Sequence, residues 1–365
     1  MSQEYANANE DILTAKTLKE TDKSCPNCSG TMQFDPGTGG LYCPYCEYRE
    51  QVKETDESIA EQDIRRAGHT DGFEWGREQK QIICNSCGAD AIYDVLEVAN
   101  VCPFCGSNHV MEAQMDDSLP PNGVIPFEVT SQTAGENFQR WLKRKWFAPS
   151  AAKKSARPNS FTGLYMPYWT FDADTFTDYS GEYGVDRSYT DKDGRRHTTT
   201  DWHRVHGTYS EFVDDELVIG TARHETSILR AIEPFDFQKL RPYNPRYLSG
   251  FAAERYSVGL DAALITGKKQ MEQKLKQTIA GKIRREHGAD HGRVSTMSVD
   301  YSNITYKYIV LPLWASAFKF KNKTFQFMVN GQSGKVGGKA PVSPLRVTVF
   351  VLAIIALLTL LAKYF

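Results

Sequence analysis

Residues 25–46 read CPNCSGTMQFDPGTGGLYCPYC, two Cys-x2-Cys pairs separated by 14 residues. The tight turn of each pair directs two sulfurs inward, and a second hairpin completes a tetrahedron around one metal ion. The same spacing recurs 59 residues later. The pattern predicts two small zinc ribbons, at 23–52 and 79–114. Their eight candidate ligands are Cys25, Cys28, Cys43, Cys46, Cys84, Cys87, Cys102 and Cys105.

The number and positions of the cysteines favour bound zinc over two alternatives, disulfide bonds and a rubredoxin-like iron site. All eight cysteines lie in pairs within the first 105 residues, which points to metal in a reducing compartment. Gly88 and Gly106 directly follow the second cysteine of their pairs, where a turn needs positive φ. Four thiolates leave no open coordination position, so both Zn2+ ions are expected to be structural.

Charge divides the chain into two parts. Residues 1–118 carry 9 Lys and Arg against 22 Asp and Glu, a net of −13, whereas the rest carries 34 against 23, a net of +11. Each four-thiolate zinc site adds a further −2. Such an acidic region repels the nucleic-acid backbone. The aromatic residues near the cysteines, Tyr42, Tyr45, Tyr48 and Phe104, are therefore expected to contact protein rather than bases.

The sequence predicts a multidomain protein, with an α+β domain rich in antiparallel strands at 120–340. Helices are expected at 131–147 and 257–286, and strands at 161–221 and 294–330. In the second helix Met271, Leu275, Ile279 and Ile283 recur every four residues. A polar tail is expected at 1–22 and a polar linker at 53–78. The two ribbons are therefore expected to be small independent units joined by a flexible linker.

Two segments of the α+β region resemble each other. LYMPYWTFDADTF begins at residue 164 and IVLPLWASAFKF at residue 309, and they align on Pro167 with Pro312 and on Trp169 with Trp314. This repeat suggests either duplicated strands that meet in one sheet or two related half-domains.

The C-terminal sequence VTVFVLAIIALLTLLAKYF, residues 347–365, contains 16 consecutive uncharged residues. A buried core helix is the alternative, but such a helix usually keeps a polar face, so we expect a transmembrane anchor at 345–365. No secretory signal opens the chain. Lys335, Lys339 and Arg346 precede the span, which predicts a single-pass cell-membrane protein with its bulk in the cytoplasm.

The basic remainder suggests a second contact with the membrane. The run from Arg140 to Lys145 and the basic helix at 268–285 could each face anionic lipid, although a solvated helix surface would have the same composition.

Two polar clusters raise the question of catalysis. Asp172 and Asp174 lie on one side of an expected strand and could hold a divalent ion with the histidines of DWHRVHG. His203 and His206, however, point to opposite faces of a strand. Phosphate loops, nucleophile elbows and HExxH are missing from the sequence. We therefore expect no enzyme activity and no catalytic residues.

The sequence also resembles a bacterial group of membrane-anchored proteins with TFIIB-type zinc ribbons, some encoded beside phage-shock protein A homologues. The matching segments are CPNC/CPYC, CNSC/CPFC, GLYMPYWTFDAD, LPLWASAFKFKNKTFQFMVNGQSGKVGGKAP and the terminal span. The resemblance implies a non-enzymatic adaptor in a membrane-stress assembly. Its implied partners are a phage-shock protein A homologue or flotillin-like protein and a second membrane protein.

The expected function is therefore recruitment of protein partners to the cytoplasmic face of the membrane. The alternative is a membrane-tethered nucleic-acid-binding protein linked to replication or transcription. It would use the basic patch at 140–157 rather than the ribbons.

Overall fold

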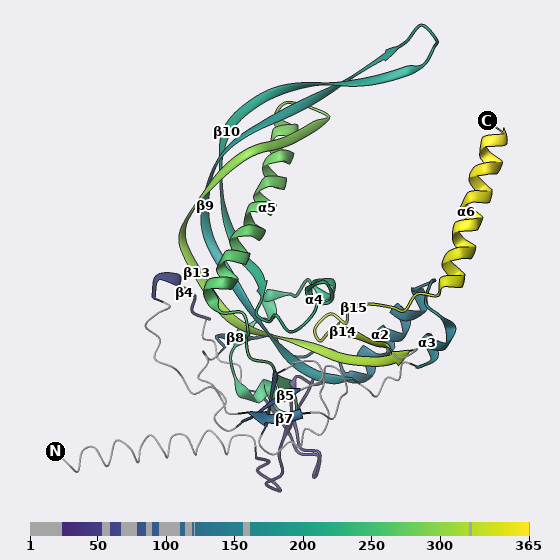
Figure 1. Cartoon of the computed structure of the whole chain (residues 1–365). Helices are drawn as coiled ribbons and strands as arrows, with labels where there is room; N and C mark the ends of the chain where they lie inside the picture. Colours follow the sequence, from purple (N-terminus) through teal and green to yellow (C-terminus); the bar gives the residue numbers. More distant parts are fainter. Residues whose placement is uncertain are drawn as a thin grey trace.

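Three long antiparallel strands form the curved sheet that dominates the computed structural model (Figure 1). β9 spans Thr162–Thr190 and lies between β10, Arg196–Ile219, and β13, His291–Phe320. The strands contain 29, 24 and 30 residues, so each follows a path of about 80–100 Å at roughly 3.3 Å per residue.

The structure describes residues 24–52, 59–66, 79–84, 90–94, 110–113, 119, 121–155, 161–320 and 323–364. Within these ranges the large sheet has twelve strands. Its nine shorter strands are β4 Gln62–Asp63, β5 Gln79–Cys84, β6 Asp90–Asp94, β7 Val110–Ala113, β8 Gly123–Val124, β11 Arg241–Pro242, β12 Ala252–Ala253, β14 Lys323–Asn330 and β15 Val336–Gly338. The helices are α2 Ser131–Arg144, α3 Ser150–Ser155, α4 Thr226–Ile232, α5 Leu260–Glu286 and α6 Pro344–Tyr364, with 3-10 turns η2 Ile64–Arg66, η4 Phe237–Lys239 and η5 Pro245–Leu248.

Burial along β9 changes in three steps. Residues 163–173 are buried on both faces, residues 174–179 alternate between exposed and buried, and residues 186–190 are exposed. The strand thus begins inside a two-sided core and ends as a ribbon in solvent. We call residues 174–213 and 291–303, which lie beyond the core, the arm.

Two β-bulges mark the boundary between the core and the arm. β10 is bulged between Val213 and Glu216, and β13 between Ser302 and Thr305, both opposite residues 171–174 of β9. Asp215 in β10 and Asn303 in β13 adopt positive φ angles of 49° and 50°. Bulges bend and twist a strand, so a pair at the same level accounts for the curvature seen in Figure 1.

Helix α5 lies along the inner side of the curve (Figure 1). Its buried residues recur at helical spacing: Ala263, Gly267, Met271, Leu275, Ile279 and Ile283. Ile283 packs where β9 has Gly181; a Cβ at that glycine would lie 2.8 Å from the Ile283 Cδ1 atom. The outer part of α5 and the arm therefore form their own small hydrophobic cluster.

The two Pro-x-Trp segments pair with each other in one sheet. Tyr165 lies opposite Pro312, and Pro167 lies opposite Val310. Each buried indole donates to a backbone carbonyl: Trp169 to Val258 at 2.9 Å and Trp314 to Val129 at 2.7 Å. Of the two arrangements that the sequence suggested, the structure shows the single sheet.

The first cysteine module packs against the α+β domain instead of lying apart from it. Its three strands, β1 Gln33–Asp35, β2 Gly40–Tyr42 and β3 Arg49–Gln51, form a small antiparallel sheet. The Phe34 ring meets Tyr247 edge-on at 5.5 Å, and the Phe34 N–H donates to the Ser249 carbonyl at 3.0 Å. For this module, the prediction of an independent unit on a flexible linker is wrong, because apolar side chains of the module and of the α+β domain share one core.

Segments expected as a linker and as the second ribbon also contribute to the large sheet. β4 lies within the expected linker and pairs with β13, Gln62 opposite Tyr306. β6 lies within the second cysteine-rich segment and pairs with β12, Ile92 opposite Ala253. These pairings connect the N-terminal third of the chain to the sheet.

Candidate metal centre and membrane helix

Four cysteines converge between the hairpins of the first module. The ligand atoms of Cys25, Cys28, Cys43 and Cys46 all lie within 4.8 Å of one another. The Sγ atoms of Cys25 and Cys46 are 3.5 Å apart, and those of Cys28 and Cys43 are 3.4 Å apart. A tetrahedron with zinc–sulfur bonds of about 2.3 Å has sulfur–sulfur edges of about 3.8 Å, so the donor set fits one Zn2+.

Both Cys-x2-Cys turns are built in the same way. The Ser29 N–H donates to the Cys25 carbonyl at 2.8 Å, and the Glu47 N–H donates to the Cys43 carbonyl at 2.9 Å. Ser29 and Glu47 have positive φ angles of 59° and 62°. The second cysteine set has glycines at the equivalent positions, 88 and 106, which is the residue type that this backbone favours.

The pKa values of two of the sulfurs are shifted in opposite directions. A backbone hydrogen bond from Tyr48 lowers the pKa of Cys46 to about 6. A backbone hydrogen bond from Gly30 acts in the same direction on Cys28, but the neighbouring sulfurs and burial outweigh it and raise the pKa of Cys28 to about 12. Four adjacent thiolates repel one another, and a bound divalent cation removes that penalty.

The second cysteine set falls largely beyond the described residues. Cys84 is the last residue of β5. Cys87, Cys102 and Cys105 lie outside the described residues. The structure therefore shows one four-cysteine site, and a second zinc remains a prediction from the sequence.

The polar clusters considered for catalysis lie apart. His203 is opposite Tyr183, eleven residues along β9 from Asp172, and its ring stacks on that tyrosine at 5.0 Å. His206 contacts Ser180 through its Nδ1 atom at 2.9 Å. Asp201 pairs with Arg187 at 2.8 Å. The arrangement does not combine these histidines with Asp172 in one metal site.

Asp172 belongs instead to a buried ionic network with Lys307. The Lys307 Nζ atom lies 2.9 Å from Asp215 and 3.3 Å from each of Asp172 and Glu61. Burial raises the pKa of Asp172, whereas the backbone N–H of Asp215 and the charge of Lys307 act to lower it. Asp172, Asp214 and Asp215 also meet the distance requirement for a cation site. The Lys307 ammonium already supplies a positive charge to Asp172 and Asp215.

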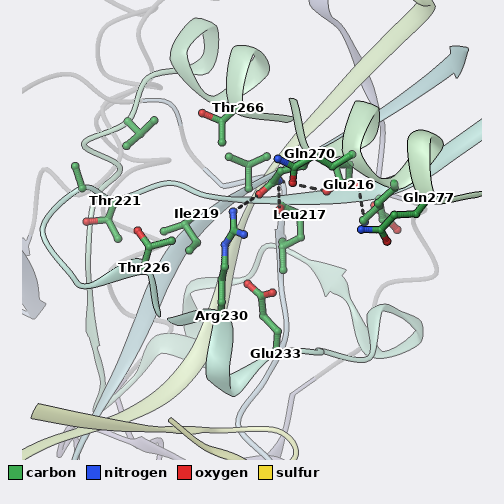
Figure 2. Close-up of a pocket in the computed structure, with 16 residues that line it drawn as sticks. Glu216, Leu217, Ile219, Thr221, Thr226, Arg230, Glu233, Thr266, Gln270 and Gln277 are labelled. Atoms are coloured by element: carbon green, nitrogen blue, oxygen red, sulfur yellow. Dashed lines mark hydrogen bonds and ion pairs between the residues drawn. The ribbon is translucent and has the colours of Figure 1, made fainter. Parts of the chain in front are cut away.

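A cleft of about 470 Å³ opens between β10, α4 and α5 (Figure 2). The buried Glu216 carboxylate accepts from Lys274 at 2.5 Å and from Gln270 at 3.2 Å. Arg230 donates to the Gln270 side chain at 2.7 Å, and burial raises the pKa of Glu233. The network links β10 to α4 and to the middle of α5.

Helix α6 is long and apolar enough to cross a membrane. The window Pro344–Leu361 has a mean hydropathy of 2.4, and none of it is buried. The first turns of α6 contact the junction between α2 and α3, where Phe350 meets Trp146 and Phe147 edge-on at 5.6 and 5.3 Å. Beyond that contact the apolar side chains face solvent.

Comparison with known proteins yields one distant relative to report. A protein of Bacillus subtilis (strain 168), described as uncharacterized protein YdjG, is 26% identical over 329 residues. The match covers 87% of this chain and 89% of that protein, so the similarity extends over nearly the whole length. No family model matches the chain. No solved structure matches it either.

Proposed function

We propose that this protein is a non-enzymatic adaptor held in the cell membrane by α6, with the bulk of the chain in the cytoplasm. The observation that carries the proposal is the exposure of α6: no residue of its 18-residue apolar window is buried. At 1.5 Å per residue that window is about 27 Å long, close to the roughly 30 Å of a bilayer's hydrocarbon core. A core helix of this composition would be buried.

The orientation follows from charge and from cysteine chemistry. Lys335 and Lys339 precede the apolar window and Arg346 lies in its first turn, and such residues collect on the cytoplasmic side of a span. Thiolate ligands also persist best in a reducing compartment. Both considerations support a cytoplasmic location for the cysteine modules and the α+β domain.

The first cysteine module offers a surface for protein partners. Its Phe34 side is occupied by the domain, whereas Tyr45, on the second Cys-x2-Cys turn, is 76% exposed. An exposed tyrosine on a turn fixed by metal is a typical anchor in protein interfaces, since little side-chain entropy is lost on binding. Partners of the phage-shock protein A or flotillin class, together with a second membrane protein, are the candidates that the family resemblance suggests.

The test is capture of partners by the full chain from membranes solubilised in mild detergent, with metal analysis of the same samples. Tyr45→Ala should keep its metal but lose about thirtyfold in partner affinity if Tyr45 is a 2 kcal/mol hot spot. Cys43→Ser should lose one zinc per chain and weaken capture as well.

Trp202→Ala is the matched control, because Trp202 is an exposed aromatic residue on the arm. It should leave both the zinc content and the capture unchanged. Capture that survives both Tyr45→Ala and Cys43→Ser would show that the first cysteine module does not recruit the partner.

A further inference from the structure

The end of α2 lies beside the start of α6. The backbone N–H of Ser343 donates to the Phe147 carbonyl at 2.8 Å. Arg346 donates to the carbonyls of Trp146 and Ala148 at 2.8 and 2.7 Å, and to the Ser150 hydroxyl at 2.8 Å. The loop after α2 is thus joined to the first turn of the apolar helix, and Figure 1 shows α2 and α3 at its base.

This end of α2 carries three consecutive cations and an aromatic residue. Lys143, Arg144 and Lys145 are exposed, and Trp146 is 68% exposed. Within the described part of the chain, none of the three cations lies within 4.0 Å of a carboxylate. We call these four residues the basic–aromatic patch.

The other basic run differs in position and in ionic pairing, although Lys145 of the patch also lies over an aromatic ring, that of Trp141, at 4.8 Å. Several cations of α5 are engaged by the chain itself: Lys274 pairs with Glu216 at 2.5 Å, while Lys268 and Lys282 lie over the rings of Tyr301 and Tyr209. Helix α5 also lies along the arm, away from the base of α6 (Figure 1). The sequence did not distinguish the two runs, whereas the structure favours the one on α2.

The patch stays near the start of α6 when the helix turns. The arm and α6 project from the same side of the domain (Figure 1), and the arm carries exposed charges such as Arg187 and Arg204, which do not enter hydrocarbon. Insertion therefore requires α6 to turn away from the arm. Five residues, 339–343, join β15 to α6, so the helix start stays within about 22 Å of the end of β15. α2 packs against β14 and β15 and remains nearby.

We propose that the basic–aromatic patch binds the headgroups of anionic phospholipids where α6 enters the bilayer. This proposal rests on the proposed function, since it needs α6 in the membrane. The three cations neutralise headgroup phosphate charge, and the Trp146 indole lies at the level of the headgroups, where tryptophan is enriched. Each cation near an anionic leaflet strengthens binding about fivefold.

The experiment measures lipid retention by the full chain. The protein is purified in mild detergent, mixed with equal amounts of phosphatidylglycerol and phosphatidylcholine, and the bound lipids are counted by native mass spectrometry. The wild type should retain phosphatidylglycerol in severalfold excess. The triple variant Lys143→Gln, Arg144→Gln and Lys145→Gln should lose most of that excess.

The control variant makes the same charge change on α5 with Lys269→Gln, Lys276→Gln and Arg284→Gln, all exposed residues. It should behave like the wild type. Equal loss in both variants would mean that net charge alone attracts the lipid. No loss in the α2 variant would mean that the basic–aromatic patch does not bind the lipid. Either result overturns the proposal. So would displacement of the lipid by 10 mM inorganic phosphate, or tighter binding of a DNA duplex by the same residues.

Membrane extraction of the same variants separates the two proposals. The α2 triple variant should stay in the membrane fraction, because α6 is intact. If the wild type stays in the membrane fraction but retains no excess of phosphatidylglycerol, only the headgroup proposal fails. If the wild type itself leaves the membrane at alkaline pH, the proposed function fails and the patch proposal with it.

Discussion

Lys307 is a buried lysine whose charge the fold balances with three carboxylates. Its side chain is 8% exposed, and that of Asp172 is 1% exposed. Burial acts to lower the pKa of Lys307, but the hydrogen bond and charge of Asp215, together with Asp172 and Glu61, raise it overall. The ammonium is therefore charged at neutral pH and links β9, β10 and β13 with Glu61, which directly precedes β4, at the level of the two bulges.

Lys307→Met should lower the free energy of unfolding at pH 7 by about 3–5 kcal/mol, because it leaves the buried Asp172 carboxylate without a counter-charge. Loss of Lys307 also raises the pKa of Asp172 further in the folded state. With a pKa raised in the folded state, Asp172 binds its proton more tightly in the folded state than in the unfolded state. The loss of unfolding free energy should therefore shrink as the pH falls from 7 towards 5. Urea titration of the full chain in mild detergent measures both effects.

Lys269→Met is the matched control for Lys307→Met, since Lys269 is exposed on α5. It should change stability by less than about 0.5 kcal/mol. A deficit for Lys307→Met that grows on acidification would show that the carboxylates do not depend on Lys307.

At the residue scale, the cysteine ligands could be predicted but the ionic network could not. Local spacing identifies the ligands Cys25, Cys28, Cys43 and Cys46, because each hairpin supplies two of them within four residues. The partners of Asp172 come from three distant segments, and Lys307 is 135 residues away in sequence. An Asp-x-Asp pattern on a strand contains no information about that partner.

At the element scale, α5 acts as the support of the arm. Its inner half packs on the main core, while Leu275, Ile279 and Ile283 form a separate cluster with Tyr179 and Val294 of the arm. A three-stranded ribbon exposed on both faces is marginal in water. The arm therefore depends on the outer half of α5 for its order.

Ile279→Ala should destabilise the arm locally, since Ile279 is fully buried and such truncations cost about 2–5 kcal/mol. Hydrogen exchange of the full chain should accelerate in the strand segments 176–205 and 291–300, while residues 163–171 of β9 keep their protection. Ile265→Ala, at a position of α5 that is 57% exposed, should change neither region. Unchanged exchange in the arm of the Ile279 variant would contradict the role assigned to α5.

Elements with strong local patterns lie close to where the sequence places them. α5 spans Leu260–Glu286, where spacing of four indicated a helix at 257–286. The sequence DKDG at 191–194, typical of a turn, forms the tip between β9 and β10, with Gly194 at a φ of 79°. The short helix α4 was not predicted, because its seven residues give too little periodicity. The bulges were missed because they occur at non-glycine residues.

At the scale of the whole molecule, the chain combines an acidic, cysteine-rich N-terminal part with a basic α+β domain and an exposed apolar helix. The structure joins the first two through shared core and sheet contacts. Only residues 339–343 separate β15 from α6. A single short connection thus carries the proposed attachment to the membrane, and the proposed function requires insertion of α6.

Alkaline carbonate extraction of cell membranes tests insertion most directly. The full chain should remain in the membrane pellet. A variant with Ile354→Asp and Leu358→Asp should move to the soluble fraction, because two aspartates near the middle of a span cost about 6 kcal/mol. Ile265→Asp on α5 should behave like the wild type. Release of the unmodified chain by carbonate, or retention of the double variant in the pellet, would contradict anchoring by α6.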